Sequence, residues 1–129
     1  MKSSIDIIVP YWGEFSLLKQ TVDSVLAQTS KAWHLTILDD HYPDKTAYNY
    51  YKKLDDKHIT YIRHRKNIGI TANFNYAIRH ASAPYCMIVG CDDKLLPNYV
   101  DTVLKNIGEA DFYQPRVQII DDKSNVYLP

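Results

Sequence analysis

Short apolar runs alternate with amphipathic stretches along the whole chain, and this alternation constrains the fold more than any other feature. The runs have the length of strands, and the stretches between them repeat apolar residues at helical spacing. Strands are expected at residues 5–10, 34–39, 59–63, 85–90 and 112–120. Because βαβ units cross over with one hand, this pattern predicts a mainly parallel sheet between two helical layers. We therefore expect a three-layer α/β domain.

Four helices are expected between these strands, each with one apolar face. Asp44 is placed to cap the second, Pro97 suits the first turn of the fourth, and Gly108 ends it. The residues expected to face the sheet are Leu18, Val22, Val25 and Leu26; Ala47, Tyr50, Tyr51 and Leu54; Phe74, Ala77, Ile78 and Ala81; and Leu96, Val100, Val103, Leu104 and Ile107.

The composition is that of one soluble domain. The chain has 129 residues, 46% of them hydrophobic and 23% charged, with a net charge of zero. Zero net charge argues against nonspecific nucleic-acid binding. No apolar run approaches the roughly 20 residues of a membrane span, and Asp6 and Pro10 interrupt any signal peptide. The expected location is the cytoplasm. If the chain is part of a longer protein, that protein could associate with a membrane. The chain ends at Pro129 without a capping helix, so residues 1–129 are expected to be one truncated domain.

Two pairs of adjacent aspartates end two of the expected strands. Asp39-Asp40 closes one strand, and Asp92-Asp93 follows another. Ligands of open α/β sheets bind at the carboxyl ends of the strands, so both pairs belong at the ligand-binding edge. Adjacent carboxylates repel each other unless a cation or donor is present. Either pair alone could simply start a loop or cap a helix. Their recurrence at one edge predicts a metal-assisted nucleotide or phosphate site.

A third candidate follows the strand at 59–63. Asn67-Ile68-Gly69 contains a glycine that permits close approach of a ligand, and Asn73 lies on the next helix. The basic run at 63–66 could be a solvated loop or could meet a diphosphate. The chain has no Walker-type loop and no GxGxxG motif.

These segments, taken in order, resemble a known family. They are residues 7–12 (IIVPYW), 18–29 ending in SVLAQT, 38–40 (LDD), 67–69 (NIG) with Ala72 and Asn73, and 83–93 (APYCMIVGCDD) with Pro97. Together they resemble the nucleotide-sugar-binding portion of family 2 glycosyltransferases, which have the Rossmann-like, three-layer α/β/α GT-A fold. The resemblance covers nearly the whole chain.

The resemblance implies a role for each candidate residue. Pro10 and Tyr11 would line the base and ribose, and Asp40 or Asp39 would accept a hydrogen bond from the base. Asn67 would also contact the nucleotide. Asp92 would lie toward the ribose, and Asp93 would bind Mn²⁺ or Mg²⁺.

The resemblance also implies a reaction and its partners. The donor would be a nucleotide sugar, with a UDP-sugar as the first guess, and the acceptor a glycan or a lipid-linked molecule in bacterial polysaccharide biosynthesis. Transfer would be inverting, and the family's second half would supply the general base, for which no residue can be assigned here. Residues 41–43 replace the family's usual Gly-Ser turn. Apolar residues near 117–120, left uncovered without the second half, suggest a homodimer.

Two alternatives remain. A receiver-like signalling domain has similar length, but it needs acids after its first and third strands, where this chain has Pro10-Tyr11 and Arg63-His64. A non-catalytic nucleotide-binding module would keep the same site without turnover.

Overall fold

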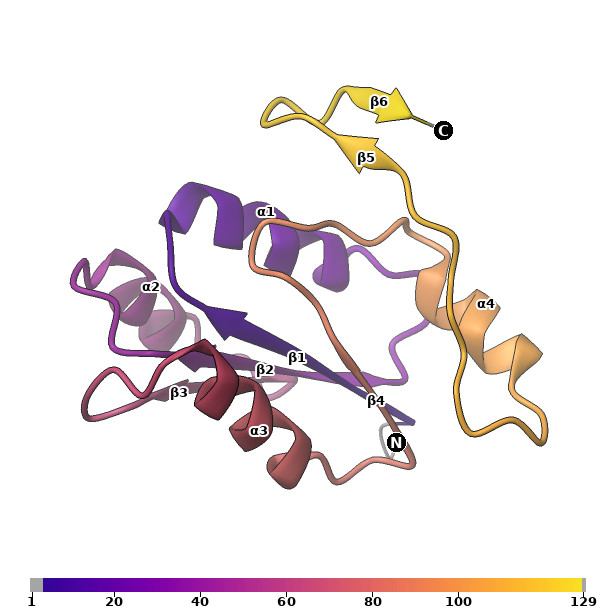
Figure 1. Ribbon diagram of the computed structural model, residues 1–129, viewed down its shortest axis with the longest axis horizontal. Helices are drawn as coiled ribbons and strands as arrows, with labels where there is room; N and C mark the ends of the chain where they lie inside the picture. Colours follow the sequence, from indigo (N-terminus) through magenta and orange to yellow (C-terminus); the bar gives the residue numbers. More distant parts are fainter. Residues whose placement is uncertain (1–3, 129) are drawn as a thin grey trace.

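The computed structural model describes residues 4–128, which form a parallel sheet flanked by helices (Figure 1). The elements in chain order are β1 (Ile5–Tyr11), α1 (Phe15–Leu26), β2 (Trp33–Asp39), α2 (Thr46–Leu54), β3 (Ile59–Arg63), α3 (Ile70–His80), β4 (Tyr85–Ile88), α4 (Tyr99–Asn106), β5 (Ile119–Ile120) and β6 (Val126–Leu128). The main sheet has the order β3-β2-β1-β4, and all its neighbours are parallel. This arrangement confirms the expected α/β fold.

Two layers of helices cover the sheet, as Figure 1 shows, with α1 and α2 on one side and α3 on the other. Side chains of β1 alternate between the two faces, since Ile7 packs in the cluster of α1, α2 and α4, whereas Ile8 packs against α3. The larger cluster includes Leu18, Val22, Ala47, Tyr51 and Val100 from the helices. The smaller cluster centres on Ile8, Leu38 and Ala77.

Pro10 lies within β1, so the strand continues one residue beyond the expected stop. The pairing of β1 with β4 ends at Ile8 and Ile88, while its pairing with β2 continues to Tyr11. Pro10 therefore occupies a position where no β4 residue needs its missing N–H.

The predicted inner face of α3 is confirmed at Ala77 and Ala81 and wrong at Phe74 and Ile78. Phe74 is 37% exposed and Ile78 is 59% exposed, whereas Asn73 and Ala77 are buried. The Asn73 side chain donates a hydrogen bond to the Leu38 carbonyl at 3.0 Å. This bond turns the helix face that carries Asn73 and Ala77 toward the sheet.

The predicted strand at 112–120 is also wrong. Only Ile119–Ile120 is a strand, and it pairs antiparallel with β6 outside the main sheet. Residues 112–118 include Pro115, which cannot donate a ladder hydrogen bond, and most of them are exposed. Helix α4 begins at Tyr99, two residues later than Pro97. Within residues 4–128, no helix has the length and apolarity needed to span a membrane.

Candidate functional site

The topology brings both aspartate pairs to the same edge of the sheet. Asp39-Asp40 ends β2, Asp92-Asp93 follows β4, and β1 lies between these strands. Tyr11, the last residue of β1, is in register with Asp39. The predicted placement is therefore confirmed, while the roles of these residues stay predictions.

Asp39 is buried and holds three partners. Its Oδ2 accepts hydrogen bonds from the Tyr61 hydroxyl at 2.7 Å and from Arg63 Nη1 at 2.6 Å, and its Oδ1 accepts one from the Tyr42 backbone N–H at 2.8 Å. Burial, followed by the bond to Asp39, raises the pKa of Tyr61, so the hydroxyl stays a donor. Asp39 is 0% exposed, so its carboxylate is committed to these partners in this structure.

Asp40 binds the backbone of residues 68 and 69, in the segment that follows β3. Its Oδ1 accepts from the Ile68 N–H at 2.7 Å and its Oδ2 from the Gly69 N–H at 3.0 Å. The Asn67 amide donates to the Asp40 carbonyl at 3.3 Å. Gly69 has φ +87°, which favours glycine. Asp40 thus brings Asn67 to the site by binding the backbone beside it.

The loop after β1 presents a different aromatic ring from the one expected. Tyr11 is 1% exposed, and its hydroxyl donates to the Gly13 carbonyl at 2.8 Å. Burial is the main cause that raises the pKa of Tyr11. Trp12 is 51% exposed, and its ring meets Tyr42 edge-on at 5.1 Å. Trp12 is therefore the side chain of this pair that a ligand can reach.

The carboxylates of Asp92 and Asp93 converge beside Gly90. A Cβ built on Gly90 would lie 2.6 Å from Asp93 Oδ2 and 3.2 Å from Asp92 Oδ1, so the two carboxylates occupy the space beside this glycine and would have to move for a larger residue. Desolvation by neighbouring atoms, followed by the charge of Asp92, raises the pKa of Asp93, although its side chain is exposed. The ion pairs found within residues 4–128 include neither aspartate. Two close negative charges thus face one space without a cation from this part of the chain.

This arrangement fits a divalent cation that completes its coordination elsewhere. Within the described residues, no group of three or more His, Cys, Asp or Glu side chains could hold a metal by itself. Mg²⁺ and Mn²⁺ prefer oxygen ligands, and Mg²⁺ is commonly held by one or two carboxylates together with substrate phosphates and water. The converging oxygens of Asp92 and Asp93 supply that kind of partial ligand set.

The sequence alone did not identify Trp12 and the ion pair of Arg63 as parts of this edge. In the sequence Arg63 belongs to a basic run that could be a solvated loop, yet its side chain is only 12% exposed in the pair with Asp39. The sequence holds one signal for this ion pair. Tyr61 and Arg63 are two residues apart on a strand, so their side chains point to the same face.

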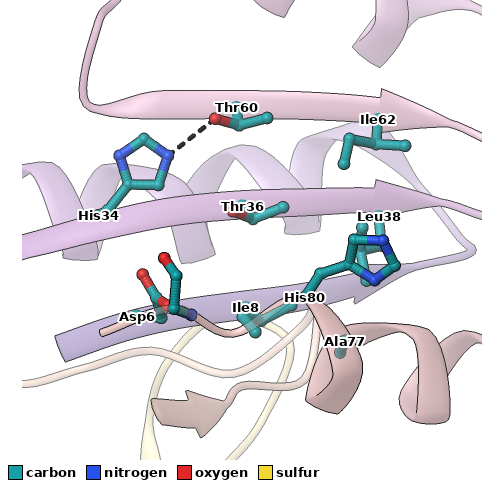
Figure 2. A pocket seen from close by; sticks show the side chains of 10 residues that line it. Asp6, Ile8, His34, Thr36, Leu38, Thr60, Ile62, Ala77 and His80 are labelled. Carbon is teal, nitrogen blue, oxygen red and sulfur yellow. Dashed lines mark hydrogen bonds between the residues drawn. The ribbon is translucent and has the colours of Figure 1, made fainter. Parts of the chain in front are cut away.

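A cavity of about 250 Å³ lies elsewhere, on the face of the sheet that carries α3 (Figure 2). Its polar lining residues are Asp6, His34, Thr36, Thr60, His80 and Ser82. Asp6 Oδ2 already accepts two backbone hydrogen bonds, from Ser82 at 2.6 Å and from Ala83 at 2.8 Å, and His34 bonds to Thr60 at 2.7 Å. None of the predicted site residues lines this cavity.

Comparisons with known proteins agree with the geometry. The family model described as glycosyl transferase family 2 matches residues 6–129. An uncharacterized glycosyltransferase of Methanocaldococcus jannaschii, MJ1057, is 30% identical over 131 residues, covering 97% of this chain and 45% of that protein. The putative colanic acid biosynthesis glycosyl transferase WcaA of Escherichia coli is 33% identical over 101 residues, covering 78% of this chain and 36% of WcaA. The chain thus spans less than half the length of these relatives.

Solved structures share the fold. TarS of S. aureus, residues 1–349 in complex with UDP, aligns with a TM-score of 0.70 at 19% identity and covers 81% of this chain and 31% of that one. The mannosyltransferase PcManGT of Pyrobaculum calidifontis, in complex with GDP-Man and Mn²⁺, aligns with a TM-score of 0.62 at 21% identity. The alignment covers 73% of this chain and 29% of PcManGT. The receiver-like alternative is therefore excluded. Sequence and fold agree with the resemblance seen at the outset, and the chain belongs to glycosyl transferase family 2.

Proposed function

We propose that this chain is the donor-binding portion of a glycosyltransferase, which binds a nucleoside-diphosphate sugar through a divalent cation. The observation that carries the proposal is the convergence of Asp92 and Asp93 beside Gly90, at the edge where β1 and β2 also end. Family membership supplies the reaction class, and the unpaired acidic pair supplies the place for the cation.

Each edge residue has a task in this proposal. Asp93 binds Mn²⁺ or Mg²⁺, and Asp92 accepts hydrogen bonds from the ribose. Asp39 and Asp40 shape the edge that faces the base, and Asp40 holds Asn67 beside the nucleotide. When bound, the cation would offset the diphosphate charge and stabilise the nucleoside-diphosphate leaving group.

The proposed donor is a UDP-sugar. TarS has been solved with UDP and with UDP-GlcNAc, which supports this choice, whereas PcManGT was solved with GDP-Man. The proposed acceptor is a glycan or a lipid-linked precursor in polysaccharide biosynthesis. This follows the relatives named for colanic acid in Escherichia coli and for teichuronic acid in Bacillus subtilis. We place the reaction in the cytoplasm, where nucleotide sugars are available to the longer protein.

We further propose an inverting mechanism whose general base lies outside these 129 residues. The chain spans less than half of its relatives, so the acceptor site belongs to the remaining portion. Donor binding without efficient transfer is the expected behaviour.

Calorimetry with nucleotides tests the proposal. UDP and GDP are titrated into the chain in Mn²⁺, in Mg²⁺ and in EDTA. We expect binding that is clear with a divalent cation and much weaker in EDTA, with UDP tighter than GDP. Equal affinity in EDTA and in Mn²⁺ would contradict the metal-dependent site. Tighter binding of GDP than of UDP would contradict the choice of uracil as the nucleobase of the donor.

A further inference from the structure

The loop that carries the acidic pair has little support of its own. It joins β4 to α4, and both Asp92 and Asp93 are exposed on it. Within the described chain, its internal backbone hydrogen bonds are Asp93 N–H to the Gly90 carbonyl at 3.1 Å and Tyr99 N–H to the Leu96 carbonyl at 3.0 Å. Contacts from outside the loop must therefore set where the two carboxylates lie.

Cys91 contacts the Trp12 carbonyl and Lys94 bonds to Ser124. Further contacts come from two polar side chains, Ser24 in the last turn of α1 and Gln28 just after it. Ser24 Oγ accepts a hydrogen bond from the Leu95 N–H at 3.1 Å. Gln28 Nε2 donates to the Leu96 carbonyl at 2.7 Å, and Gln28 Oε1 accepts from the Val100 N–H at 2.9 Å. The two side chains thus bind the backbone two and three residues after Asp93 and at the start of α4.

Both amide hydrogens and one acceptor position of Gln28 are occupied in this arrangement. The side chain is 1% exposed, and its second amide hydrogen goes to the Ser24 carbonyl at 3.1 Å. Next to it, the Thr29 N–H donates to the Pro97 carbonyl at 2.9 Å. A buried amide without partners is costly, so Gln28 is satisfied only when the loop follows this one path.

We propose that Ser24 and Gln28 are positioning residues for the metal site. They touch neither metal nor donor, but they hold the Asp92-Asp93 loop against α1, whose start follows the β1 loop at the same sheet edge. The helix that begins after the β1 loop thus contacts the acidic loop at its opposite end. This inference rests on the proposed metal-dependent donor binding and assigns a further task within it.

The test compares Gln28→Leu and Ser24→Ala with the unaltered chain. The first readout is the Mn²⁺ concentration that half-restores UDP binding, and the second is the broadening by Mn²⁺ of the Asp92 and Asp93 amide signals in NMR spectra without nucleotide. Removing a hydrogen bond that holds the backbone two or three residues from a metal ligand should weaken the metal affinity about 2- to 10-fold. We expect a rise of that order in the Mn²⁺ requirement of both variants, and weaker broadening at a given Mn²⁺ concentration. Ser24→Thr keeps the hydroxyl and should behave as the unaltered chain does.

Thr21→Val is the matched control on the same helix. Thr21 is buried, but its hydroxyl donates to the Leu17 carbonyl of its own helix at 3.3 Å and does not bind the loop. It should leave the Mn²⁺ requirement unchanged. If Gln28→Leu does not fold, Ser24→Ala decides. A native Mn²⁺ requirement in Ser24→Ala would overturn the positioning role alone, whereas absence of metal-dependent UDP binding in the unaltered chain would overturn the proposed function itself.

Discussion

At the scale of single residues, the two aspartate pairs differ in their surroundings. Asp39 and Asp40 are buried, and each carboxylate is bonded to donors from this chain. Asp92 and Asp93 are exposed, and they face one space without a cation from the described residues. The first pair therefore shapes the sheet edge, and the second pair is the one left with charge for a ligand.

Asp93→Asn should remove most of the metal dependence of UDP binding, because one charged ligand is lost. Asp92→Asn should weaken UDP binding more modestly. Calorimetry with and without Mn²⁺ measures both effects. Asp111→Asn is the control, since Asp111 is also exposed and lies outside the loop. If Asp93→Asn kept the full difference between Mn²⁺ and EDTA, the assignment of the metal ligand would be wrong.

Arg63→Met should lower the free energy of unfolding by about 3 kcal/mol, because the buried Asp39 carboxylate would lose its cation. Urea unfolding measures the change. Arg65→Met is the control, because Arg65 is exposed on the following loop and its loss should stay within about 0.5 kcal/mol. Equal effects of the two variants would show that the ion pair contributes little.

At the scale of elements, the segment after β3 depends on one glycine. Gly69 has φ +87° and ψ 160°, a region used almost only by glycine, and its N–H binds Asp40. No atom lies within 4 Å of a Cβ built there, so the constraint comes from the backbone and not from crowding. The position of Asn67 at the site therefore follows from a backbone conformation.

Gly69→Ala should cost about 1–3 kcal/mol in the free energy of unfolding. It should also weaken UDP binding, because the Asp40 bonds to this segment would shift. Urea unfolding and calorimetry provide the two readouts. Gly108→Ala is the matched control, since a Cβ there meets only the Tyr113 hydroxyl at 3.9 Å. An unchanged stability of Gly69→Ala would contradict the backbone argument.

At the scale of the whole molecule, the chain has candidate residues for binding the nucleotide sugar, but no residue is assigned to the acceptor or to the general base. A positioned general base typically contributes about 10²- to 10⁴-fold to a rate. We therefore expect the chain to bind UDP but to transfer sugar poorly to any of a panel of glycan and lipid-linked acceptors. Product formation followed by mass spectrometry is the measurement. Robust turnover would show that the chain carries its own base.

The exposed apolar residues near the β5–β6 hairpin predict self-association. Val117 is 73% exposed, Ile119 is 55% exposed and Tyr127 is 70% exposed. Exposed apolar patches of this kind favour contacts between copies. Light scattering over a concentration series should show a growing dimer fraction, and Val117→Ser with Ile119→Ser should reduce it. A constant monomer mass at high concentration would refute this prediction.

The sequence by itself determined the α/β class and the edge on which the acidic pairs lie. Strand and helix periodicities are local, and residues that end parallel strands must share an edge, so Asp39-Asp40 and Asp92-Asp93 came together by topology alone. The roles of Pro10, Tyr11, Asn67 and the four aspartates in nucleotide and metal binding stay predictions.

The tertiary structure decided which of these groups are free. Asp40 finds its donors 28 and 29 residues away, and Gln28 finds Leu96 at a separation of 68 residues. The pattern at 112–120 predicted a strand, but a strand forms only where a neighbour completes its hydrogen bonds, and the main sheet offers none to these residues. Local patterns set what each segment can form, whereas partners distant in the sequence set which polar groups are satisfied and which remain for a ligand.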